Sequence, residues 1–251
     1  LPTMALLART LAMLAMAVAT VAIKVVPLDM AQDSFDDQYR GCGPAMTTAL
    51  PALYYFEFQK NPLFAKTWVK AEAEWRKRGS PVSPLASPAQ AVAVMAYTMK
   101  YLYKEFNAAV HVAGRSLHEY RNNFHFKTLH FLLTQALVTL RHAQNVQCYH
   151  VFRGVRDINF QARRGQKVRF GQFTSTSLSK EIAQHYGTDT IFQLHTCHGV
   201  NIQAFSYDRN NREVLIPPYE TFEVTKVTQN GKRMWISLRS TGTFSKYNCA
   251  W

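Results

Sequence analysis

Acidic residues and metal-binding spacings are scarce in this chain of 251 residues. Aspartate and glutamate total 16 against 29 lysines and arginines, so the formal net charge is +13. Such a charge favours anionic partners: nucleic acid, acidic membrane surfaces or phosphate-bearing ligands. The chain contains no RNA-binding aromatic motif, zinc finger or basic helix, so we expect no nucleic-acid partner and interpret most of the charge as a solvated basic surface.

The cysteines and histidines also lack the spacings of metal sites. No CxxC pair occurs, which argues against zinc and thioredoxin-like redox chemistry. No HExxH or comparable motif occurs either, so we expect the histidines on helix surfaces or in the core. The histidines considered are His118, His125, His130, His142 and His150. The sequence therefore predicts no bound metal.

An apolar stretch opens the chain. Residues 4–23 are apolar apart from Arg9 and a few threonines. A positive charge before a run of Leu, Ala, Met and Val is typical of a signal peptide, which we predict for residues 1–23, with a transmembrane anchor as the alternative. The C-terminus has no apolar tail. We therefore expect a secreted or extracellular protein, exported directly or through secretory granules, with no stable membrane span in the mature chain.

The cysteine count fits an exported protein. An even number of cysteines in such a chain suggests two disulfides, and four cysteines permit three pairings. The cysteines are Cys42, Cys148, Cys197 and Cys249. A bridge between the first and the last would tie together the two ends of the mature domain and close a long loop, which stabilises strongly in the chain-entropy model.

Helical patterns fill the first half of the mature chain, and strand patterns fill the second. The expected helices cover residues 53–78, 88–106, 124–143 and 180–187. The expected strands cover residues 148–154, 167–177, 190–196, 200–207, 213–218, 221–229 and 233–239. Helices followed by strands, with no internal repeat and no linker, predict a single α+β domain over residues 24–251.

Three short motifs in the strand-rich half carry candidate chemistry. They are FRG around Arg153, TSTS around Ser175 and REVLIPP around Glu213. Each motif alone has an ordinary explanation: a surface arginine, a turn or helix cap, and a solvated glutamate. Their combination, in this order and spacing, is far more specific than any one of them.

In these motifs the chain resembles the arginine-specific mono-ADP-ribosyltransferases of vertebrates, and chains from birds most closely. The similarity covers nearly all of the chain after the leader, including the segments AYTMKYLYKEFN, YRNNFHFKTLHFLLTQAL, VFRGV, RFGQFTSTSLSKE, HTCHGVNI and EVLIPPYETFEV. The resemblance implies the ADP-ribosyltransferase fold, with a cleft for NAD or NADP between two small sheets. It also implies the disulfides Cys42–Cys249 and Cys148–Cys197. We expect a monomer.

The resemblance makes Arg153, Ser175 and Glu213 the catalytic residues. The guanidinium of Arg153 is a planar fork of donors suited to the phosphates of NAD. Gly154 has no side chain to keep its backbone from the nicotinamide amide. We expect Ser175 to hold Glu213 below the ribose, where positive charge develops as nicotinamide leaves. The resemblance adds Tyr97, Gln172 and Ser206 to the NAD site.

One position departs from the family pattern. The first glutamate of Glu-x-Glu falls at residue 211, where this chain has Asn211. That glutamate serves the acceptor arginine, whose guanidinium stays protonated in water, and an asparagine cannot take up a proton. Glu220 and Glu223 follow in the sequence and could in principle replace it.

Three functions follow from this pattern. The first is transfer of ADP-ribose from NAD to arginine of an acceptor protein, with release of nicotinamide. The first alternative is mainly NAD glycohydrolase activity, with water as the acceptor, because of Asn211. The second alternative is a basic binding protein that has lost its activity. A basic cluster between the first two motifs could attract anionic substrate or form a solvated loop; its members are Arg163, Arg164, Lys167 and Arg169.

Overall fold

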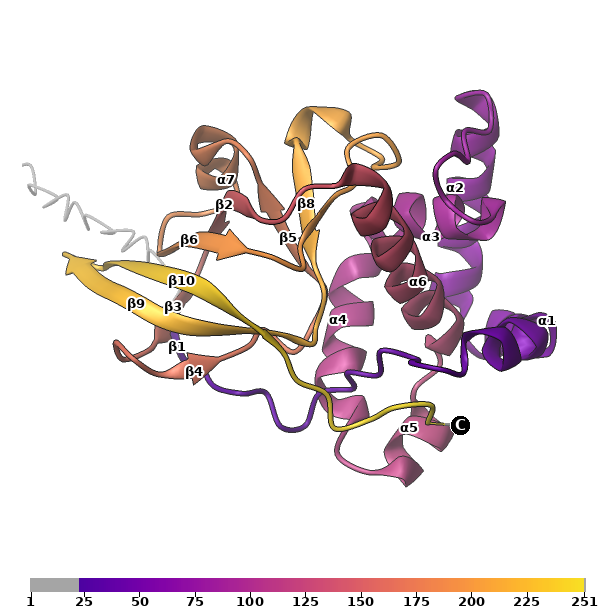
Figure 1. Cartoon of the computed structure of the whole chain (residues 1–251), viewed down its shortest axis with the longest axis horizontal. Helices are drawn as coiled ribbons and strands as arrows, with labels where there is room; N and C mark the ends of the chain where they lie inside the picture. The colour runs from indigo at the N-terminus through magenta and orange to yellow at the C-terminus, as the bar shows by residue number, and fades with distance from the viewer. Residues whose placement is uncertain (1–22, 251) are drawn as a thin grey trace, which may run out of the picture.

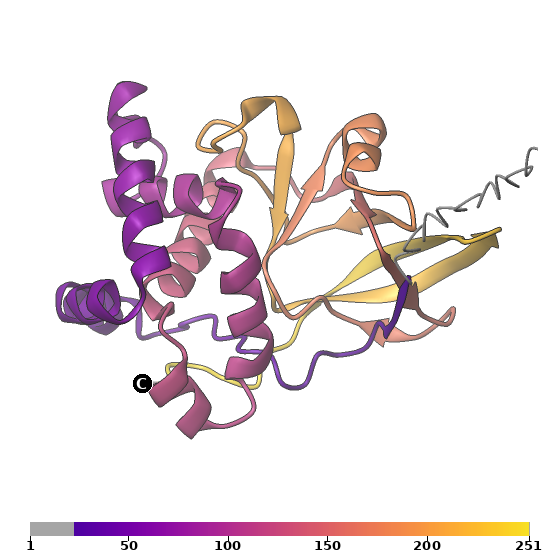
Figure 2. The same ribbon diagram turned by 180° about the vertical axis from the view of Figure 1, so that it is seen from behind.

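The computed structural model describes residues 23–250, with helices α1 to α6 on one side and α7 with most strands on the other (Figure 1; Figure 2 shows the reverse side). The signal peptide predicted for residues 1–23 therefore lies outside the described residues, except for its last position. The helices are α1 (Gly43–Lys60), α2 (Pro62–Lys77), α3 (Pro88–Thr98), α4 (Leu102–Ala113), α5 (Leu117–Asn123), α6 (Lys127–Gln144) and α7 (Lys180–His185), with the 3-10 turn η1 (Arg209–Asn211). The strands are β1 (Lys24–Pro27), β2 (Tyr149–Val155), β3 (Ile158–Gln161), β4 (Lys167–Val168), β5 (Thr174–Ser177), β6 (Thr190–Thr196), β7 (Val200–Asn201), β8 (Glu213–Ile216), β9 (Glu220–Asn230) and β10 (Arg233–Thr243). This order confirms the α+β prediction.

Two helices predicted as continuous are each divided in the structure. The helix expected over residues 53–78 is interrupted at Asn61, whose side chain caps α2, and Pro62 has no N–H with which to continue α1. The helix expected over residues 88–106 ends at Met99, whose backbone is extended, and α4 starts soon after it. Within residues 23–250, the helices lack the length and apolar character that crossing a membrane requires.

Eight of the described strands form one mixed sheet that forks. Its order is β4-β9-β10-β6-β2-β5-β8-β7, and β1 pairs with β3 in a separate two-stranded sheet. β2 pairs with β6 along its whole length, but it meets β5 only where Phe152 lies opposite Ser177. The sheet therefore opens at this point into two limbs, one from β4 to β2 and one from β5 to β7. The two small sheets implied by the resemblance are these limbs of one hydrogen-bonded sheet.

Two predicted strands are shorter than expected. The segment 167–177 forms β4 and β5, which belong to different limbs. Between them Gly171 has φ +63°, and a Cβ there would lie 2.3 Å from the Cβ of Ala31, so the chain crosses the N-terminal segment too closely to stay in one strand. The strand expected over 200–207 is confined to β7, after which the N–H of Ser206 bonds back to the carbonyl of Ile202 at 2.9 Å.

Each half of the molecule has its own hydrophobic core. The larger core lies among the helices and includes buried phenylalanines such as Phe64, Phe106 and Phe131. The smaller core lies on the sheet and includes Val151 and Phe192. Burial of one such side chain contributes about 1.5–3 kcal/mol. Because each half has its own core, the boundary between them is free to hold a cleft.

The segments before α1 and after β10 lie side by side (Figure 1). Asp36 joins them: its carboxylate accepts from the N–H of Lys246 at 2.9 Å and of Tyr247 at 3.0 Å, and it lies 2.5 Å from the guanidinium of Arg169. Arg169 is fully buried, so its placement in a solvated or anion-attracting loop is wrong. The other three members of that predicted cluster, Arg163, Arg164 and Lys167, are exposed.

Two disulfides close the domain, with the pairing that the resemblance implies. Cys42 and Cys249 are 207 residues apart, so this bridge stabilises by about 5 kcal/mol in the chain-entropy model. Cys148 precedes β2 and Cys197 follows β6, so the second bridge links the ends of two neighbouring strands. Between them the bridges hold the terminal segments and the middle of the sheet.

Candidate active site

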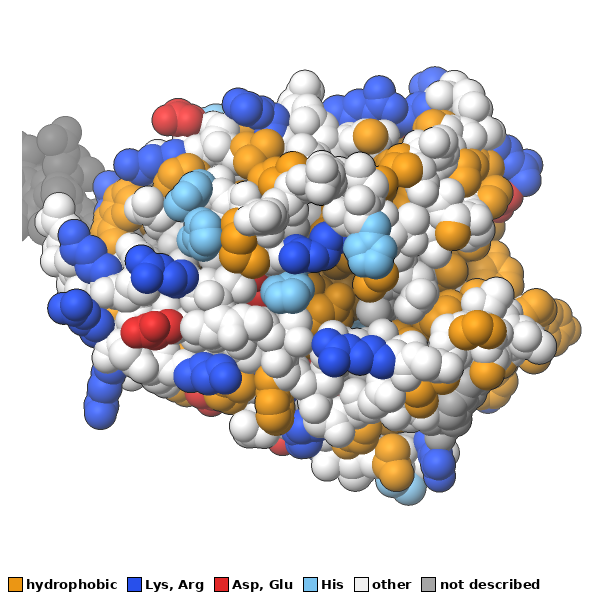
Figure 3. Space-filling view, in the orientation of Figure 1, with side chains coloured by type: hydrophobic (Ala, Val, Ile, Leu, Met, Phe, Trp, Pro, Cys, Tyr) orange, Lys and Arg blue, Asp and Glu red, His pale blue; other side chains and the backbone are white. Residues whose placement is uncertain are grey.

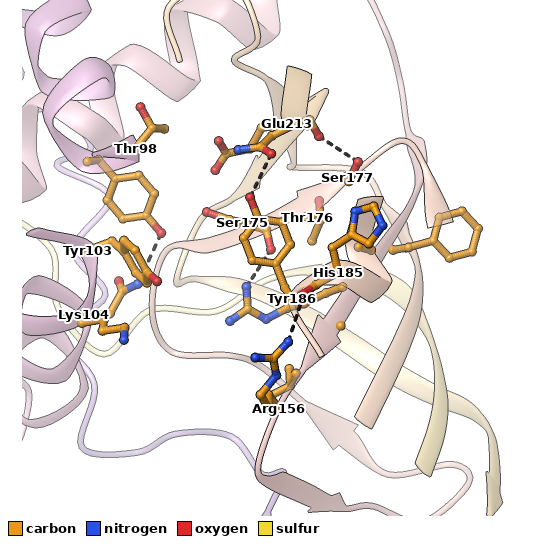
Figure 4. A pocket seen from close by; sticks show the side chains of 18 of the residues that line it. Thr98, Tyr103, Lys104, Arg156, Ser175, Thr176, Ser177, His185, Tyr186 and Glu213 are labelled. Carbon is orange, nitrogen blue, oxygen red and sulfur yellow. Dashed lines mark hydrogen bonds between the residues drawn. The ribbon is translucent and has the colours of Figure 1, made fainter. Parts of the chain in front are cut away.

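A cavity of about 570 Å³ lies at the fork of the sheet. In Figure 4 the helical side contributes Thr98, Tyr103 and Lys104. The opposite side carries Ser175 and Glu213 on strands and Tyr186 after α7. A cavity of this size with a few convergent polar groups is the usual form of a small-ligand site.

β2 places an arginine and a glycine side by side in this cavity. Nη1 of Arg153 donates to the backbone carbonyl of Ser175 at 2.7 Å, which fixes the guanidinium across the gap between β2 and β5. Burial lowers the pKa of Arg153 from its ordinary value, while Tyr97, Tyr103 and Glu213 act in the opposite direction. The arginine therefore stays cationic in a partly desolvated position.

Gly154 is required for a reason that the sequence did not show. A Cβ at this position would lie 2.2 Å from the carbonyl oxygen of Gly187 and 2.3 Å from that of Ala183. Only a glycine therefore lets α7 and the turn after it pack against β2. This packing forms one wall of the cavity.

Glu213, the first residue of β8, is 6% exposed and lines the cavity. Its Oε2 accepts a hydrogen bond from Oγ of Ser206 at 3.2 Å. Burial raises the pKa of the Glu213 carboxyl, whereas hydrogen bonding by Ser175 and Ser206 and the charge of Arg153 lower it. Neither Glu213 nor Arg153 is in an ion pair with a described residue. The two side chains therefore line the same cavity without a direct contact between their charged groups.

Tyr97 and Asn107 hold the floor of the cavity beside β5. The Tyr97 hydroxyl donates to the carbonyl of Phe173 at 2.9 Å, and Nδ2 of Asn107 donates to the same carbonyl at 3.0 Å. Burial raises the pKa of Tyr97 to about 12, so it remains a neutral phenol. Oδ1 of Asn107, which is 7% exposed, has no hydrogen-bond partner among the described residues. This oxygen is a free acceptor at the cavity wall.

Asn211 lies at the mouth of the cavity, two residues before Glu213. Its backbone carbonyl accepts from Oγ of Ser177 at 2.8 Å, and its side-chain Oδ1 accepts from the hydroxyl of Tyr186 at 2.8 Å. Arg212, in the left-handed conformation with φ +47°, separates it from β8. The position that carries a glutamate in the family pattern therefore holds a neutral, hydrogen-bonded amide.

The structure brings together most, but not all, of the residues proposed from the sequence. Tyr97, Arg153, Gly154, Ser175, Asn211 and Glu213 line the cavity. Ser206 does not line it but contacts Glu213 from behind. Gln172 lies on the segment before β5, away from the lining, where its carbonyl accepts from Thr174. Its role in NAD binding remains a prediction.

Sequence reasoning missed several lining residues. They are Tyr103, Lys104, Asn107, Arg156, His185 and Tyr186. Only Asn107 gave a usable signal, since a polar residue on the apolar face of a helix has to find partners. The others are exposed or half-buried polar and aromatic side chains whose significance depends on the fold.

Two further sequence hypotheses find no support in the geometry. The Glu220 carboxylate accepts from the N–H groups of Cys197 at 2.8 Å and His198 at 3.1 Å, outside the cavity, and Glu223 is exposed on β9. Neither can replace a glutamate at position 211. Among the described residues, Cys148, His195 and Cys197 form a group with metal-ligand atoms, but both sulfurs are in a disulfide.

The sequence matches known proteins over most of its length. The model of the family "NAD:arginine ADP-ribosyltransferase" matches residues 28–246. NAD(P)(+)–arginine ADP-ribosyltransferase 2 of Gallus gallus is 51% identical over 227 residues, covering 89% of this chain and 72% of the relative. GPI-linked NAD(P)(+)–arginine ADP-ribosyltransferase 1 of Mus musculus is 46% identical over 237 residues, covering 89% and 72% respectively.

A solved structure supports the same grouping. A mutant of the eukaryotic mono-ADP-ribosyltransferase ART2.2, crystallised in complex with NAD, superposes with a TM-score of 0.77 at 35% identity. The match covers 90% of this chain and 99% of the other. The fold thus has a close parallel in a protein crystallised with NAD.

Proposed function

Because the chain belongs to the NAD:arginine ADP-ribosyltransferase family, we propose that it transfers ADP-ribose from NAD to an arginine side chain of an acceptor protein. The bond between the ribose C1′ and the nicotinamide nitrogen breaks, and neutral nicotinamide leaves with the bonding electrons. A guanidinium nitrogen then bonds to C1′ and loses a proton. NAD is a substrate here, and the relatives' names extend this role to NADP.

The observation that carries the proposal is the placement of Arg153 and Glu213 in one cavity without a direct ion pair. The guanidinium of Arg153 suits the pyrophosphate, since it can offer two parallel donors to phosphate oxygens. Lys104 and Arg156, also in the lining, add positive charge for the same group. A protein that only binds through its surface has no need for this arrangement.

Glu213 would act on the other end of the dinucleotide. As nicotinamide leaves, positive charge grows on the ribose ring, and a fixed carboxylate stabilises that state more than the ground state. Ser175 and Ser206 serve as positioning residues, because their hydroxyls lower the pKa of Glu213 and so favour the ionised form. Catalysis therefore requires deprotonated Glu213.

A second candidate function is hydrolysis of NAD, favoured by Asn211. The acceptor guanidinium must lose a proton, and a neutral amide engaged by Tyr186 cannot accept it. Loss of a general base typically costs about 10²- to 10⁴-fold in rate. Cleavage of the nicotinamide bond rests on Glu213 and is affected less, so water competes better as the acceptor than in a relative with a glutamate here.

One assay separates these functions. The purified, disulfide-bonded protein is incubated with radiolabelled NAD and agmatine, a small guanidine acceptor, and the products are resolved by chromatography. We expect labelled ADP-ribosyl-agmatine together with free ADP-ribose. Free ADP-ribose alone would assign the chain as a hydrolase, and unchanged NAD would contradict both functions and favour a binding protein.

Substitution at Asn211 sharpens the assignment. Asn211→Glu supplies the missing carboxylate and should raise the ratio of conjugate to free ADP-ribose by as much as about 10²-fold, the lower range of general-base effects. Asn211→Gln is the matched control, since it lengthens the side chain equally without adding a proton acceptor. An equal ratio in both variants would show that residue 211 does not set the acceptor.

Export of the protein is part of the proposal. Two disulfides, a predicted leader over residues 1–23 and a mouse relative named as GPI-linked all support an extracellular location for residues 24–251. We further expect the domain to act as a monomer, because the candidate site is built within one chain. Recovery of the protein from the culture medium of expressing cells tests export, and size-exclusion chromatography of that protein tests the monomer.

A further inference from the structure

Another cavity, of about 380 Å³, shares no lining residue with the candidate active site. In Figure 3 side chains of Lys, Arg and His gather around a hollow near the middle of the face, between α6 and β10. We call it the basic cavity; its rim is formed by Arg40, Arg141, His142 and His198, and Val138 and Tyr219 contribute apolar surface. No residue that lines it carries a carboxylate.

The two arginines of the basic cavity have donors to spare. Nη2 of Arg40 donates to Gln38 at 2.8 Å and to Thr243 at 3.3 Å, which leaves its Nε and Nη1 without a partner among the described residues. Arg141, half-buried in the last turn of α6, makes no hydrogen bond or ion pair with any described residue. The nitrogens of Arg141 are not among the buried side-chain atoms that lack a partner in the described chain, so they reach solvent and are available to an acceptor that enters the cavity.

The carboxylates of Asp37 and Glu220 do not serve as acceptors for the two arginines, because both already accept hydrogen bonds from backbone N–H groups. Asp37 accepts from the N–H groups of Tyr39 at 2.6 Å and Ala250 at 2.8 Å. Glu220 accepts from the N–H of His198 and two neighbouring donors. These bonds hold the walls of the cavity in place, and neither carboxylate forms an ion pair with Arg40 or Arg141.

The charges of the two arginines affect the pKa values of His198 and Tyr219. Burial, together with the charges of Arg141 and Arg40, lowers the pKa of His198 to about 4. Burial and the charge of Glu220 raise the pKa of the Tyr219 hydroxyl, whereas the same two arginines lower it. The charges of both guanidinium groups therefore affect the same two side chains, His198 and Tyr219, in the wall of the cavity.

We propose that the basic cavity is a second ligand site, which binds a phosphate or sulfate group carried on a small molecule. Guanidinium groups bind tetrahedral oxyanions through paired charge-assisted hydrogen bonds, and two of them meet here. The disulfide Cys42–Cys249 and the hydrogen bonds of the Asn248 side chain hold the backbone of Arg40. The bonds from its Nη2 to Gln38 and Thr243 orient the guanidinium before the ligand arrives. The apolar wall of Val138 and Tyr219 accommodates the organic part of the ligand.

The test uses phenyl phosphate and phenyl sulfate as probes on the disulfide-bonded protein, at constant ionic strength and with Arg153→Gln present to remove phosphate binding at the candidate active site. Titration is followed by calorimetry and by the NMR signals of the His198 ring. We expect saturable binding and a rise in the pKa of His198, because an anion in the cavity favours the imidazolium. Tighter binding of one probe identifies the preferred ester.

Arg141→Gln should weaken binding of the preferred probe by about 10- to 100-fold, the range for loss of hydrogen bonds to a charged group. Arg233→Gln, an exposed arginine at the start of β10, is the matched control and should leave the affinity unchanged. Arg40→Gln offers a second variant if Arg141→Gln lowers the thermal unfolding temperature. Linear, unsaturable shifts, or equal losses in Arg141→Gln and Arg233→Gln, would overturn the proposal.

Discussion

Glu57 in the helical half and Glu213 in the strand-rich half are both buried, and burial raises the pKa of both. Their surroundings differ. The carboxylate of Glu57 accepts from the backbone N–H groups of Lys127 at 2.6 Å and Thr128 at 2.9 Å, at the start of α6. Glu213 is held only by side-chain hydroxyls and lines a cavity. Burial alone therefore does not identify a catalytic carboxylate.

Glu220 allows the same comparison within the strand-rich half, to which Glu213 also belongs. Burial raises its pKa as well, yet it accepts two backbone N–H groups and the hydroxyl of Thr196 at 2.6 Å. Two buried glutamates thus satisfy the backbone, whereas the third lines a cavity. Substitution of Glu213 and of Glu57 should separate a catalytic from a structural carboxylate.

The largest effect is expected from Glu213→Gln. Removing the charge that stabilises the developing cation should slow nicotinamide release by about 10²- to 10³-fold. The free energy of unfolding at pH 7 should stay equal or rise, because a raised pKa means that the ionised carboxylate costs stability above that pKa. Nicotinamide release and urea denaturation measure the two quantities. A stable variant with full activity would remove Glu213 from the mechanism.

Glu57→Ala should show the opposite pattern. It leaves the N–H groups of Lys127 and Thr128 without an acceptor, and an unsatisfied buried donor costs about 1–3 kcal/mol. We expect the urea midpoint to fall while kcat for NAD cleavage, measured on the folded fraction, is retained. If kcat fell as far as in Glu213→Gln, the distinction between the two carboxylates would fail.

Ser206→Ala and Ser175→Ala should change the pH dependence of cleavage. Both hydroxyls lower the pKa of Glu213, so each substitution raises it and the carboxylate is lost at a higher pH. The acid limb of kcat/KM should therefore move to higher pH, with the larger move for Ser175→Ala because its hydroxyl has the larger effect. Ser179→Ala, which removes the α7 cap outside the cavity, is the control and should leave the limb in place.

The smallest effect is expected from Tyr186→Phe. The variant loses the hydrogen bond to Asn211, worth about 0.5–1.5 kcal/mol, and frees the amide at the mouth of the cavity. The ratio of agmatine conjugate to free ADP-ribose should change by about 2- to 10-fold, with KM for NAD unchanged. A changed KM with a constant ratio would place Tyr186 in dinucleotide binding instead.

Much of the fold could be predicted from the sequence, because its signals are local. Ser87 before Pro88 predicts the start of α3, and the Ser87 side chain does accept from the N–H of Gln90 at 3.3 Å. The apolar spacing of residues 124–143 predicts α6, and alternation predicts most strands. The three site motifs were found because their order resembles a known family.

The remaining features depend on contacts between distant segments. Gly154 is needed because α7 packs against it, and Gly171 because the N-terminal segment crosses there. The sequence placed Arg169 in a basic loop, yet in the structure it forms a buried ion pair with Asp36, which is far away in the sequence. Tyr186 reaches the cavity only because the turn after α7 brings it there. No local pattern contains this information.

The most direct measurement is a crystal structure of this protein with a non-hydrolysable NAD analogue. We predict hydrogen bonds from the Arg153 guanidinium to the pyrophosphate and contact between the Glu213 carboxylate and the nicotinamide ribose. A dinucleotide bound elsewhere, or one with Glu213 turned away from the ribose, would contradict the central claim that this glutamate stabilises the developing cation.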